Sequence, residues 1–250
     1  MSGPRAGLAL LFALLVCLAG APARAGDPCD APSDLIANAE PLRHVARAIV
    51  QRAALRILVV GTASSTMGGT SAPGTTYPVR LADDLRQRLP QVEVTLQTRG
   101  GRGMPAAELE TAMVDALPEF HPDLVIWQTG TVDAVNGVDA DEFAATLRTG
   151  VEKVAAAKAD MVLMDQQFSR LARATVNYTP YRQAIETVAN ATDAVMVRRY
   201  ELMRHWAESG QIDLERAPRR DWQRTADQLH ACLAQVLAKA ILAGVREAKR

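Results

Sequence analysis

The stretch RILVVGTASSTMGG, Arg56–Gly69, decides the fold. Four branched apolar residues, Ile57–Val60, run without a polar interruption into a turn of glycine, alanine and hydroxyl side chains. This pattern is typical of a strand that is buried on both faces and ends in a tight loop. In an open α/β sheet, loops at the carboxyl ends of the strands form the ligand crevice. The serines of this loop are therefore candidates for chemistry, although a loop that merely caps the next helix has the same composition.

Four further short apolar segments follow, and helical patterns separate them. The predicted later strands are Val92–Leu96, Asp123–Gln128, Met161–Met164 and Ala194–Val197. The predicted helices are Ser33–Leu55, Tyr77–Leu89, Pro105–Leu117, Phe143–Val154, a segment around Tyr181–Val188, Tyr200–Ala207 and Leu229–Val245. Strands that alternate with helices predict an α/β fold, a three-layer α/β/α sandwich with a central parallel sheet of about five strands.

Composition narrows the function classes. The chain has 250 residues, and 48% hydrophobic content is ample for the core of one domain. The formal net charge is zero and there is no dense basic segment, so we expect no nucleic-acid partner. The histidines and cysteines lack metal-ligand spacing, and the loop Gly61–Gly69 lacks the lysine of a phosphate-binding loop. We expect neither a metal nor a cofactor.

The first 25 residues have the pattern of a secretory signal peptide. Arg5 provides a positive start, Leu8–Leu18 is an apolar run that is short for a bilayer, and Ala23–Ala25 is an A-x-A cleavage site. An uncleaved membrane anchor is the alternative. Cleavage would place the mature chain in the periplasm or outside the cell, and no later segment predicts an integral membrane span.

Cleavage would leave two cysteines, Cys29 and Cys232, one near each end of the mature chain. In an oxidising compartment they predict a disulfide that ties the N-terminal arm to the last helix. Closing so long a loop would contribute roughly 4–5 kcal/mol in the chain-entropy model. The alternative is two free thiols, one buried and one exposed.

Four features lie where strands end or where the last helix begins. They are Ser64, Gly103, the turn Gly130–Asp133, and Asp227 followed three residues later by His230. An acid at this spacing, at a helix start, allows the carboxylate to accept from one ring nitrogen and leaves the other nitrogen to face a serine. That contact would set the tautomer that a histidine base needs. Alone, the same spacing also describes a solvated pair or a helix cap.

In this order the four features resemble the SGNH hydrolases, also called the GDSL esterase and lipase family. The resemblance covers an SGNH hydrolase-like domain over residues 56–250, after an N-terminal helical arm over residues 26–55. Thr62–Ser64 stands where the family has Gly-Asp-Ser, and Ser64–Gly68 is similar to the second half of the variant block Gly-Ser-Ser-Ser-Thr-x-Gly. Tyr77–Leu81 looks like the helix start of such members. The resemblance implies a flavodoxin-like fold of SGNH type and ester hydrolysis without a cofactor.

The resemblance also implies a role for each residue. Ser64 would be the nucleophile, and its backbone N–H would be part of the oxyanion hole, the set of donors that binds the negative oxygen of the tetrahedral intermediate. Gly103 would supply a second backbone donor. His230 would be the general base and Asp227 its orienting acid. The chemistry agrees, because a serine nucleophile needs a base and such donors, and glycine lets the backbone approach the substrate closely.

The sequence departs from the family in two blocks. The family's third block is Gly-x-Asn-Asp, and Val132 replaces the Asn, whose side chain donates to the oxyanion. Losing one such donor typically costs about 10²–10³ in turnover. Thr131 and Asn136 are candidate substitute donors. In the first block Ala63 replaces Asp, and Ser65 is a rival nucleophile whose side chain would point differently.

Weaker signals surround this proposed site. Met67 and Met104 flank it and are candidates for an acyl pocket, although methionine is a general gap-filler. Arg170 and Tyr178 follow the fourth strand and are candidates for substrate binding, with a solvated loop as the alternative. Trp127 ends a buried strand and is predicted to be core.

The sequence therefore predicts a secreted or periplasmic serine esterase that acts on a small-molecule or carbohydrate acyl ester. Acetyl groups on envelope carbohydrate are the expected substrate by analogy only. Because of Val132, the alternative is a catalytically impaired SGNH-fold protein that binds or scaffolds envelope carbohydrate. A structural α/β domain unrelated to hydrolases is a third interpretation.

Overall fold

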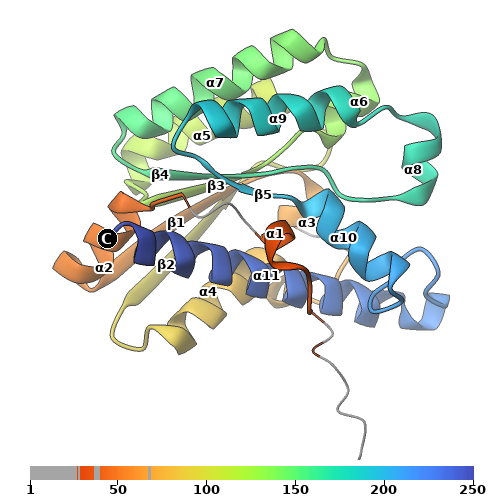
Figure 1. Ribbon diagram of the computed structural model, residues 1–250, viewed down its shortest axis with the longest axis horizontal. Helices are drawn as coiled ribbons and strands as arrows, with labels where there is room; N and C mark the ends of the chain where they lie inside the picture. The colour runs from red at the N-terminus through yellow and green to blue at the C-terminus, as the bar shows by residue number, and fades with distance from the viewer. Residues whose placement is uncertain (1–26, 28, 37–39, 67–68) are drawn as a thin grey trace, which may run out of the picture.

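The computed structural model (Figure 1) describes residues 27, 29–36, 40–66 and 69–250. The predicted signal peptide and Met67 lie outside the described residues. Five strands form one parallel sheet in the order β2-β1-β3-β4-β5. Their bounds are β1 Ala54–Val60, β2 Glu93–Arg99, β3 Leu124–Gln128, β4 Asp160–Met164 and β5 Val195–Val197.

Helices cover both faces of this sheet (Figure 1). In the figure α5, α7 and α9 lie on one face, and α2, α4 and α11 lie on the other. The helices are α1 Ser33–Ile36, α2 Arg43–Arg52, α3 Ala63–Thr66, α4 Tyr77–Arg88, α5 Ala106–Phe120, α6 Thr131–Asn136, α7 Ala140–Ala156, α8 Arg170–Thr175, α9 Thr179–Ala191, α10 Arg199–Glu208 and α11 Trp222–Glu247, with short 3₁₀ turns at Pro73–Thr75 and Arg219–Asp221. The predicted three-layer α/β/α sandwich is confirmed.

The strand order creates the crevice in which a site can form. The chain leaves β1 toward β2 on one side, and then crosses to β3 on the other side of β1. All residues of β3 are buried, and Val60 of β1 lies beside Trp127 of β3. The carboxyl ends of β1 and β3 therefore meet at the topological switch point, where ligands bind in open α/β sheets. Trp127 is fully buried, as predicted for a core residue.

Two predicted helices differ from the observed ones. The predicted helix Ser33–Leu55 is divided into α1 and α2, and Ala53 ends α2 in the left-handed conformation with φ 48°. The last helix begins at Trp222 rather than at Leu229, because its first turn is largely exposed and therefore shows no apolar periodicity. Asp227 and His230, which are three residues apart, consequently lie inside α11 on one helical face, and not at its start.

The predicted disulfide is confirmed. Cys29 and Cys232 are bonded across a sequence separation of 203 residues, with Cα atoms 4.8 Å apart. The bond attaches the segment before α1 to the middle of α11. The Trp206 indole N–H adds a second attachment by donating to the Asp30 carbonyl at 3.0 Å. The division into an arm over residues 26–55 and a domain over residues 56–250 stays a prediction.

One segment among the described residues, Arg219–Glu247, is long and apolar enough for a membrane span by length and mean hydropathy. This is contrary to the sequence analysis, which expects no such segment. However, 67% of its most apolar window is buried inside the protein. Its apolar face packs against α4 and α2, so we assign α11 as a core helix.

Candidate active site

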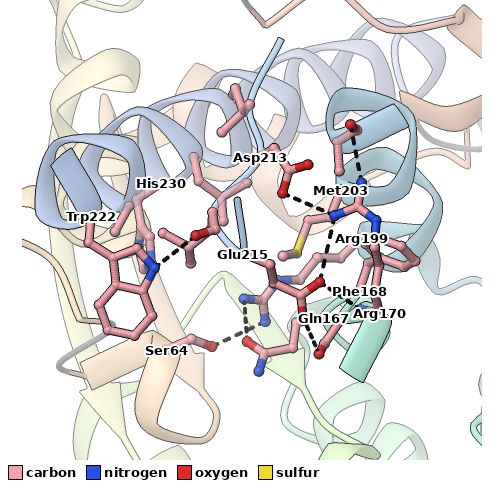
Figure 2. Close-up of a pocket in the computed structure, with 16 residues that line it drawn as sticks. Ser64, Gln167, Phe168, Arg170, Arg199, Met203, Asp213, Glu215, Trp222 and His230 are labelled. Atoms are coloured by element: carbon pink, nitrogen blue, oxygen red, sulfur yellow. Dashed lines mark hydrogen bonds and ion pairs between the residues drawn. The ribbon is translucent and has the colours of Figure 1, made fainter. Parts of the chain in front are cut away.

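Side chains that follow three strands converge on one region with a side chain of α11 (Figure 2). Ser64 lies on α3 directly after β1, Gln167 follows β4, and Arg199 begins α10 after β5. Together with His230 of α11, these three residues line a cavity of about 190 Å³. The structure thus brings the predicted nucleophile and the predicted base to one cavity, although 166 positions separate them along the chain.

Two side chains hold the Ser64 hydroxyl. It donates to Gln128 Oε1 at 3.0 Å and accepts from Arg199 Nη1 at 3.1 Å. Gln128 is the last residue of β3, and its Nε2 donates to Thr62 Oγ1 at 3.2 Å. The second bond fixes the orientation of the amide, so that Oε1 faces the serine. Ser64 Oγ is therefore oriented by one neutral acceptor and one cationic donor.

Ser65, the rival nucleophile, has a structural position. Its side chain is buried, it does not line the cavity, and its Oγ donates to Gln128 Oε1 at 2.9 Å. It accepts in turn from the Tyr77 hydroxyl at 2.7 Å. Burial raises the pKa of Tyr77 to about 12, so the phenol keeps its proton as a donor. These contacts favour Ser64 over Ser65 for chemistry.

His230 and Asp227, the predicted dyad, each have a hydrogen-bond partner from the segment between α3 and α4 or from the start of α4. Nδ1 of His230, a buried side chain, accepts from the Tyr77 backbone N–H at 2.9 Å. The Asp227 carboxylate accepts from the Ser71 backbone N–H at 3.0 Å and from the Ser71 hydroxyl at 2.5 Å. A nitrogen that accepts carries no proton, so in a neutral ring the proton is on Nε2. The predicted contact between the Asp227 carboxylate and a ring nitrogen of His230 stays a prediction.

Burial shifts the titration of the charged groups below the cavity. Burial raises the pKa of Asp165 to about 6, against a backbone hydrogen bond from Tyr200 and the positive charges of Arg182 and Arg199. Burial lowers the pKa of Arg199, although a guanidinium stays protonated at neutral pH. Among the described residues no carboxylate forms an ion pair with Arg199, and Asp165 acts on it at longer range.

Apolar side chains form most of the remaining wall of the cavity. They are Phe168, Met203, Ala207, Ile212, Leu214, Ala226 and Leu229. A second, more open space of about 700 Å³ shares Ser64, Gln167 and Trp222 with the first. Trp222 is 56% exposed, and in Figure 2 it extends from α11 on the side of Ser64. A smaller, largely apolar space and a larger space therefore meet at Ser64.

The described residues contain no cluster of three or more His, Cys, Asp or Glu side chains placed to hold a metal ion. The ionisable groups that line the cavity are Arg170, Arg199, Asp213, Glu215 and His230.

The model of the non-GDSL lipase-like family matches residues 28–247 of the chain. The chain belongs to this family. The match spans the whole sheet and the residues of the cavity. The resemblance to SGNH hydrolases is thus confirmed by a family assignment and, below, by the fold.

Solved structures show which folds this member of the non-GDSL lipase-like family is similar to. A two-domain esterase, CEX, active on acetylated mannans, is 19% identical with a TM-score of 0.62, over 83% of this chain and 54% of that chain. TesA is 16% identical with a TM-score of 0.58, over 74% of this chain and 99% of that chain. A catalytic mutant of Axe2, an acetylxylan esterase from Geobacillus stearothermophilus, is 18% identical with a TM-score of 0.55, over 76% and 94%.

At these identities the likeness establishes the fold and not the activity. The chain spans about half of the two-domain esterase, 54% of its length. No curated protein sequence matches the chain.

The other predicted oxyanion donors lie outside the lining of the cavities around Ser64. Gly103, Thr131, Val132 and Asn136 line neither of the two cavities that contain the serine. Gly103 is exposed with φ 81°, and the Thr131 hydroxyl is buried without a hydrogen-bond partner among the described residues. The side-chain donor that reaches Ser64 Oγ is Arg199. The expected roles of Gly103, Thr131 and Asn136 stay predictions.

The predicted substrate-binding residues are scattered. Arg170 lines the smaller cavity, but its guanidinium is paired with Asp213 at 3.0 Å and lies 3.6 Å from Glu215. Tyr178 is buried and lines a separate cavity of about 440 Å³. Met104 is half-buried against the hydrophobic core and lines neither cavity that contains Ser64.

Sequence reasoning missed Gln128, Gln167, Arg199 and Trp222. Gln128 and Arg199 each stand at the carboxyl end of an apolar segment, LVIWQ and VMVRR, where a polar residue enters the crevice. Position after a strand was the signal that could have found them. Their contact with Ser64 carries no pattern in the sequence.

Proposed function

We propose that this protein is a serine esterase that hydrolyses acyl esters through an acyl-serine intermediate. One observation carries the proposal: the Ser64 hydroxyl and the His230 imidazole line the same cavity at the carboxyl edge of the sheet. Membership of the non-GDSL lipase-like family supports it. So does the fold, which is shared with esterases of other specificities.

The reaction follows from these groups. Ser64 Oγ attacks the ester carbonyl carbon, its proton passes to His230, and the carbonyl oxygen becomes an oxyanion. Collapse of the intermediate expels the alcohol, which takes the proton from His230, and leaves the acyl-serine. Water then attacks with His230 as base, and the acid and free Ser64 are released. The steps balance without a metal or a cofactor.

His230 requires a different position of its ring proton before it can act as the base. Nδ1 of His230 now accepts a backbone N–H, which puts the proton of the neutral ring on Nε2. To accept a proton at Nε2, the imidazole must carry its proton on Nδ1 and donate it to a carboxylate. Asp227 lies three residues earlier on the same helix and would exchange its bond to Ser71 for this role.

The sizes of the two cavities at Ser64 indicate the size of the substrate. The smaller volume of about 190 Å³ equals roughly six water molecules, enough for a short acyl chain on the apolar side. The open space of about 700 Å³ has room for an alcohol the size of a sugar. We propose an acyl ester of a carbohydrate as the substrate class, in line with CEX, which is active on acetylated mannans, and the acetylxylan esterase Axe2.

Active-site labelling tests the proposal. The purified protein should hydrolyse p-nitrophenyl acetate and butyrate, and a fluorophosphonate should label it at Ser64. Ser64→Ala should lose both properties. The matched control, Ser65→Ala, removes the neighbouring hydroxyl and should keep the label. A folded wild-type protein with neither hydrolysis nor label would contradict the proposal.

One observation favours a second candidate, a carbohydrate-binding or scaffolding module without catalysis. Asp227 is bound to Ser71, and Nδ1 of His230 is bound to the Tyr77 backbone. Both contacts engage groups that the proposed acid–base dyad would use. Binding of acetylated oligosaccharide by Ser64→Ala, together with an inactive wild type, would support the module instead.

We also propose that the protein is exported through its first 25 residues. The disulfide between Cys29 and Cys232 supports export, since such bonds persist in oxidising compartments. Mass spectrometry of the protein from its native host should show an N-terminus at Gly26. An intact N-terminus in a membrane fraction would indicate an uncleaved anchor.

A further inference from the structure

The buried guanidinium of Arg199 has no role in the proposed reaction of Ser64 and His230. Arg199 is 1% exposed, yet it lines the cavity and donates from Nη1 to Ser64 Oγ at 3.1 Å. Its Nη2 lies 3.5 Å from Gln167 Oε1, and its Nε has no hydrogen-bond partner among the described residues. Figure 2 shows the guanidinium between Ser64 and Gln167.

A buried cation in these surroundings is costly. Its hydrogen-bond partners are neutral oxygens, and Asp165, which acts on it electrostatically, instead accepts from the Tyr200 backbone and lies 3.5 Å from Arg182. Desolvating a charge without an ion partner is unfavourable by several kcal/mol. A protein retains such a group where a negative charge forms or binds. The cavity side of Arg199 is therefore a place for an anion.

Geometry indicates which anion. In the tetrahedral intermediate the oxyanion and Ser64 Oγ are bonded to the same carbon atom. A donor 3.1 Å from Ser64 Oγ is therefore within reach of the oxyanion, two bonds away. Donors that stabilise oxyanions lie 2.7–3.1 Å from that oxygen and act most strongly where water is excluded.

We propose that Arg199 donates to the oxyanion of the ester-hydrolysis intermediate and stabilises its charge. The assignment rests on the proposed function. It supplies the side-chain donor that Val132 cannot provide, from the end of β5 rather than from the loop after β3. As attack proceeds, Nη1 turns from Ser64 Oγ to the new anion, and the Ser64 proton goes to His230. The charge of Arg199 then has a partner only in the transition state, which raises kcat rather than binding.

Steady-state kinetics with p-nitrophenyl butyrate tests the assignment. Arg199→Met should lower kcat about 10²–10³-fold and leave KM within about threefold. Arg199→Lys, which keeps the charge but loses the planar fork, should fall between the two. The matched control is Arg198→Met, since the neighbouring Arg198 is paired with Glu186 and lines neither cavity that contains Ser64. It should behave as wild type.

Chemical rescue separates hydrogen bonding from charge. Guanidinium at millimolar concentration should restore part of kcat to Arg199→Ala, whereas tetramethylammonium, which has no N–H, should not. Thermal unfolding should show all variants folded, because replacing a buried charge by an apolar side chain of similar size is often neutral or stabilising. If Arg199→Met fails to fold, the Lys variant and the rescue of the Ala variant decide.

The outcomes distinguish a failure of the role assigned to Arg199 from a failure of the proposed esterase function. An active wild type with unchanged kcat in Arg199→Met overturns the assignment alone. A loss confined to KM would overturn it too, since Arg199 would then bind an anionic group of the ground-state substrate. Equal rescue by tetramethylammonium would overturn the hydrogen-bonding role. A folded wild type that neither hydrolyses nor labels overturns the proposed function itself.

Discussion

At the scale of single residues, Ser71 binds the Asp227 carboxylate, to which the proposed reaction assigns the role of orienting His230. Burial alone would raise the pKa of Asp227, but the side-chain and backbone hydrogen bonds from Ser71 hold it below its usual value. The carboxylate is therefore ionised at neutral pH and engaged by Ser71. In the proposed reaction this contact delays assembly of the dyad.

Ser71→Ala should raise kcat/KM for short acyl esters by roughly tenfold. The reason is that a hydrogen bond to a charged group contributes about 1.5–3 kcal/mol, and its loss frees one Asp227 oxygen for the imidazole. Ser71→Thr keeps the hydroxyl and should remain close to wild type. A fall in kcat/KM of the Ala variant would show that Asp227 acts from its present position.

The buried carboxyl of Asp165 predicts a pH dependence of stability. Its pKa is raised by burial from an ordinary 3.8 to about 6, so the folded state holds this proton more tightly than the unfolded state. The stabilisation is complete below the unfolded pKa and is lost as pH rises through about 6. Relative to Asp165→Asn, the free energy of unfolding of the wild type should fall by roughly 3 kcal/mol between acidic and neutral pH. Urea denaturation of both proteins at a series of pH values measures the difference. A difference that is constant with pH would contradict the prediction.

At the scale of elements, the end of β2 and the end of β1 approach each other too closely for a side chain. Gly100 has φ 103°, and a Cβ at this position would lie 2.2 Å from the Gly61 carbonyl oxygen. Gly61 opens the loop that carries Ser64. The glycine therefore sets the distance between two strand ends and, through it, the position of the serine.

Gly100→Ala should destabilise the fold by about 1–3 kcal/mol and lower esterase activity, because the backbone must shift to relieve the overlap. Gly74→Ala is the matched control, since a Cβ there meets no atom within 4 Å. The control should change stability by less than about 0.5 kcal/mol. Thermal and urea unfolding measure both, and equal stability of the two variants would contradict the role assigned to Gly100.

At the scale of the whole molecule, the disulfide joins the segment before α1 to the middle of α11. Cys29 and Cys232 are both buried, and the bond closes a loop that contains the entire sheet. The chain-entropy model assigns about 5 kcal/mol to a loop of this length. The bond thus stabilises the fold as a whole rather than one layer.

The double variant Cys29→Ala/Cys232→Ala should lower the free energy of unfolding by about 2–5 kcal/mol. Ester hydrolysis below its melting temperature should persist, since the disulfide is not among the residues that line the cavity. Urea unfolding with and without reductant checks the value, and the variant should not respond to reductant. An equally stable variant would show that α11 packs without the bond.

The sequence by itself determined the layers. Uninterrupted apolar runs such as Ile57–Val60 specify strands, and apolar residues at helical spacing specify helices. Both patterns can be predicted from the sequence because they depend on neighbours along the chain. The same local logic placed Ser64 after the first strand. The predicted start of α11 was wrong, because the first turn of this helix is largely exposed and has no apolar periodicity.

Only the tertiary structure decided the partners of the polar side chains. Gln128 and Arg199 meet Ser64 from β3 and from the end of β5, and Ser71 donates to Asp227. Such contacts depend on which strand ends adjoin in space and on which buried groups must be satisfied, and neither condition repeats with a period along the chain. The chain order determined that a serine and a histidine would reach the crevice, whereas the folded geometry decided that a guanidinium lies beside the serine.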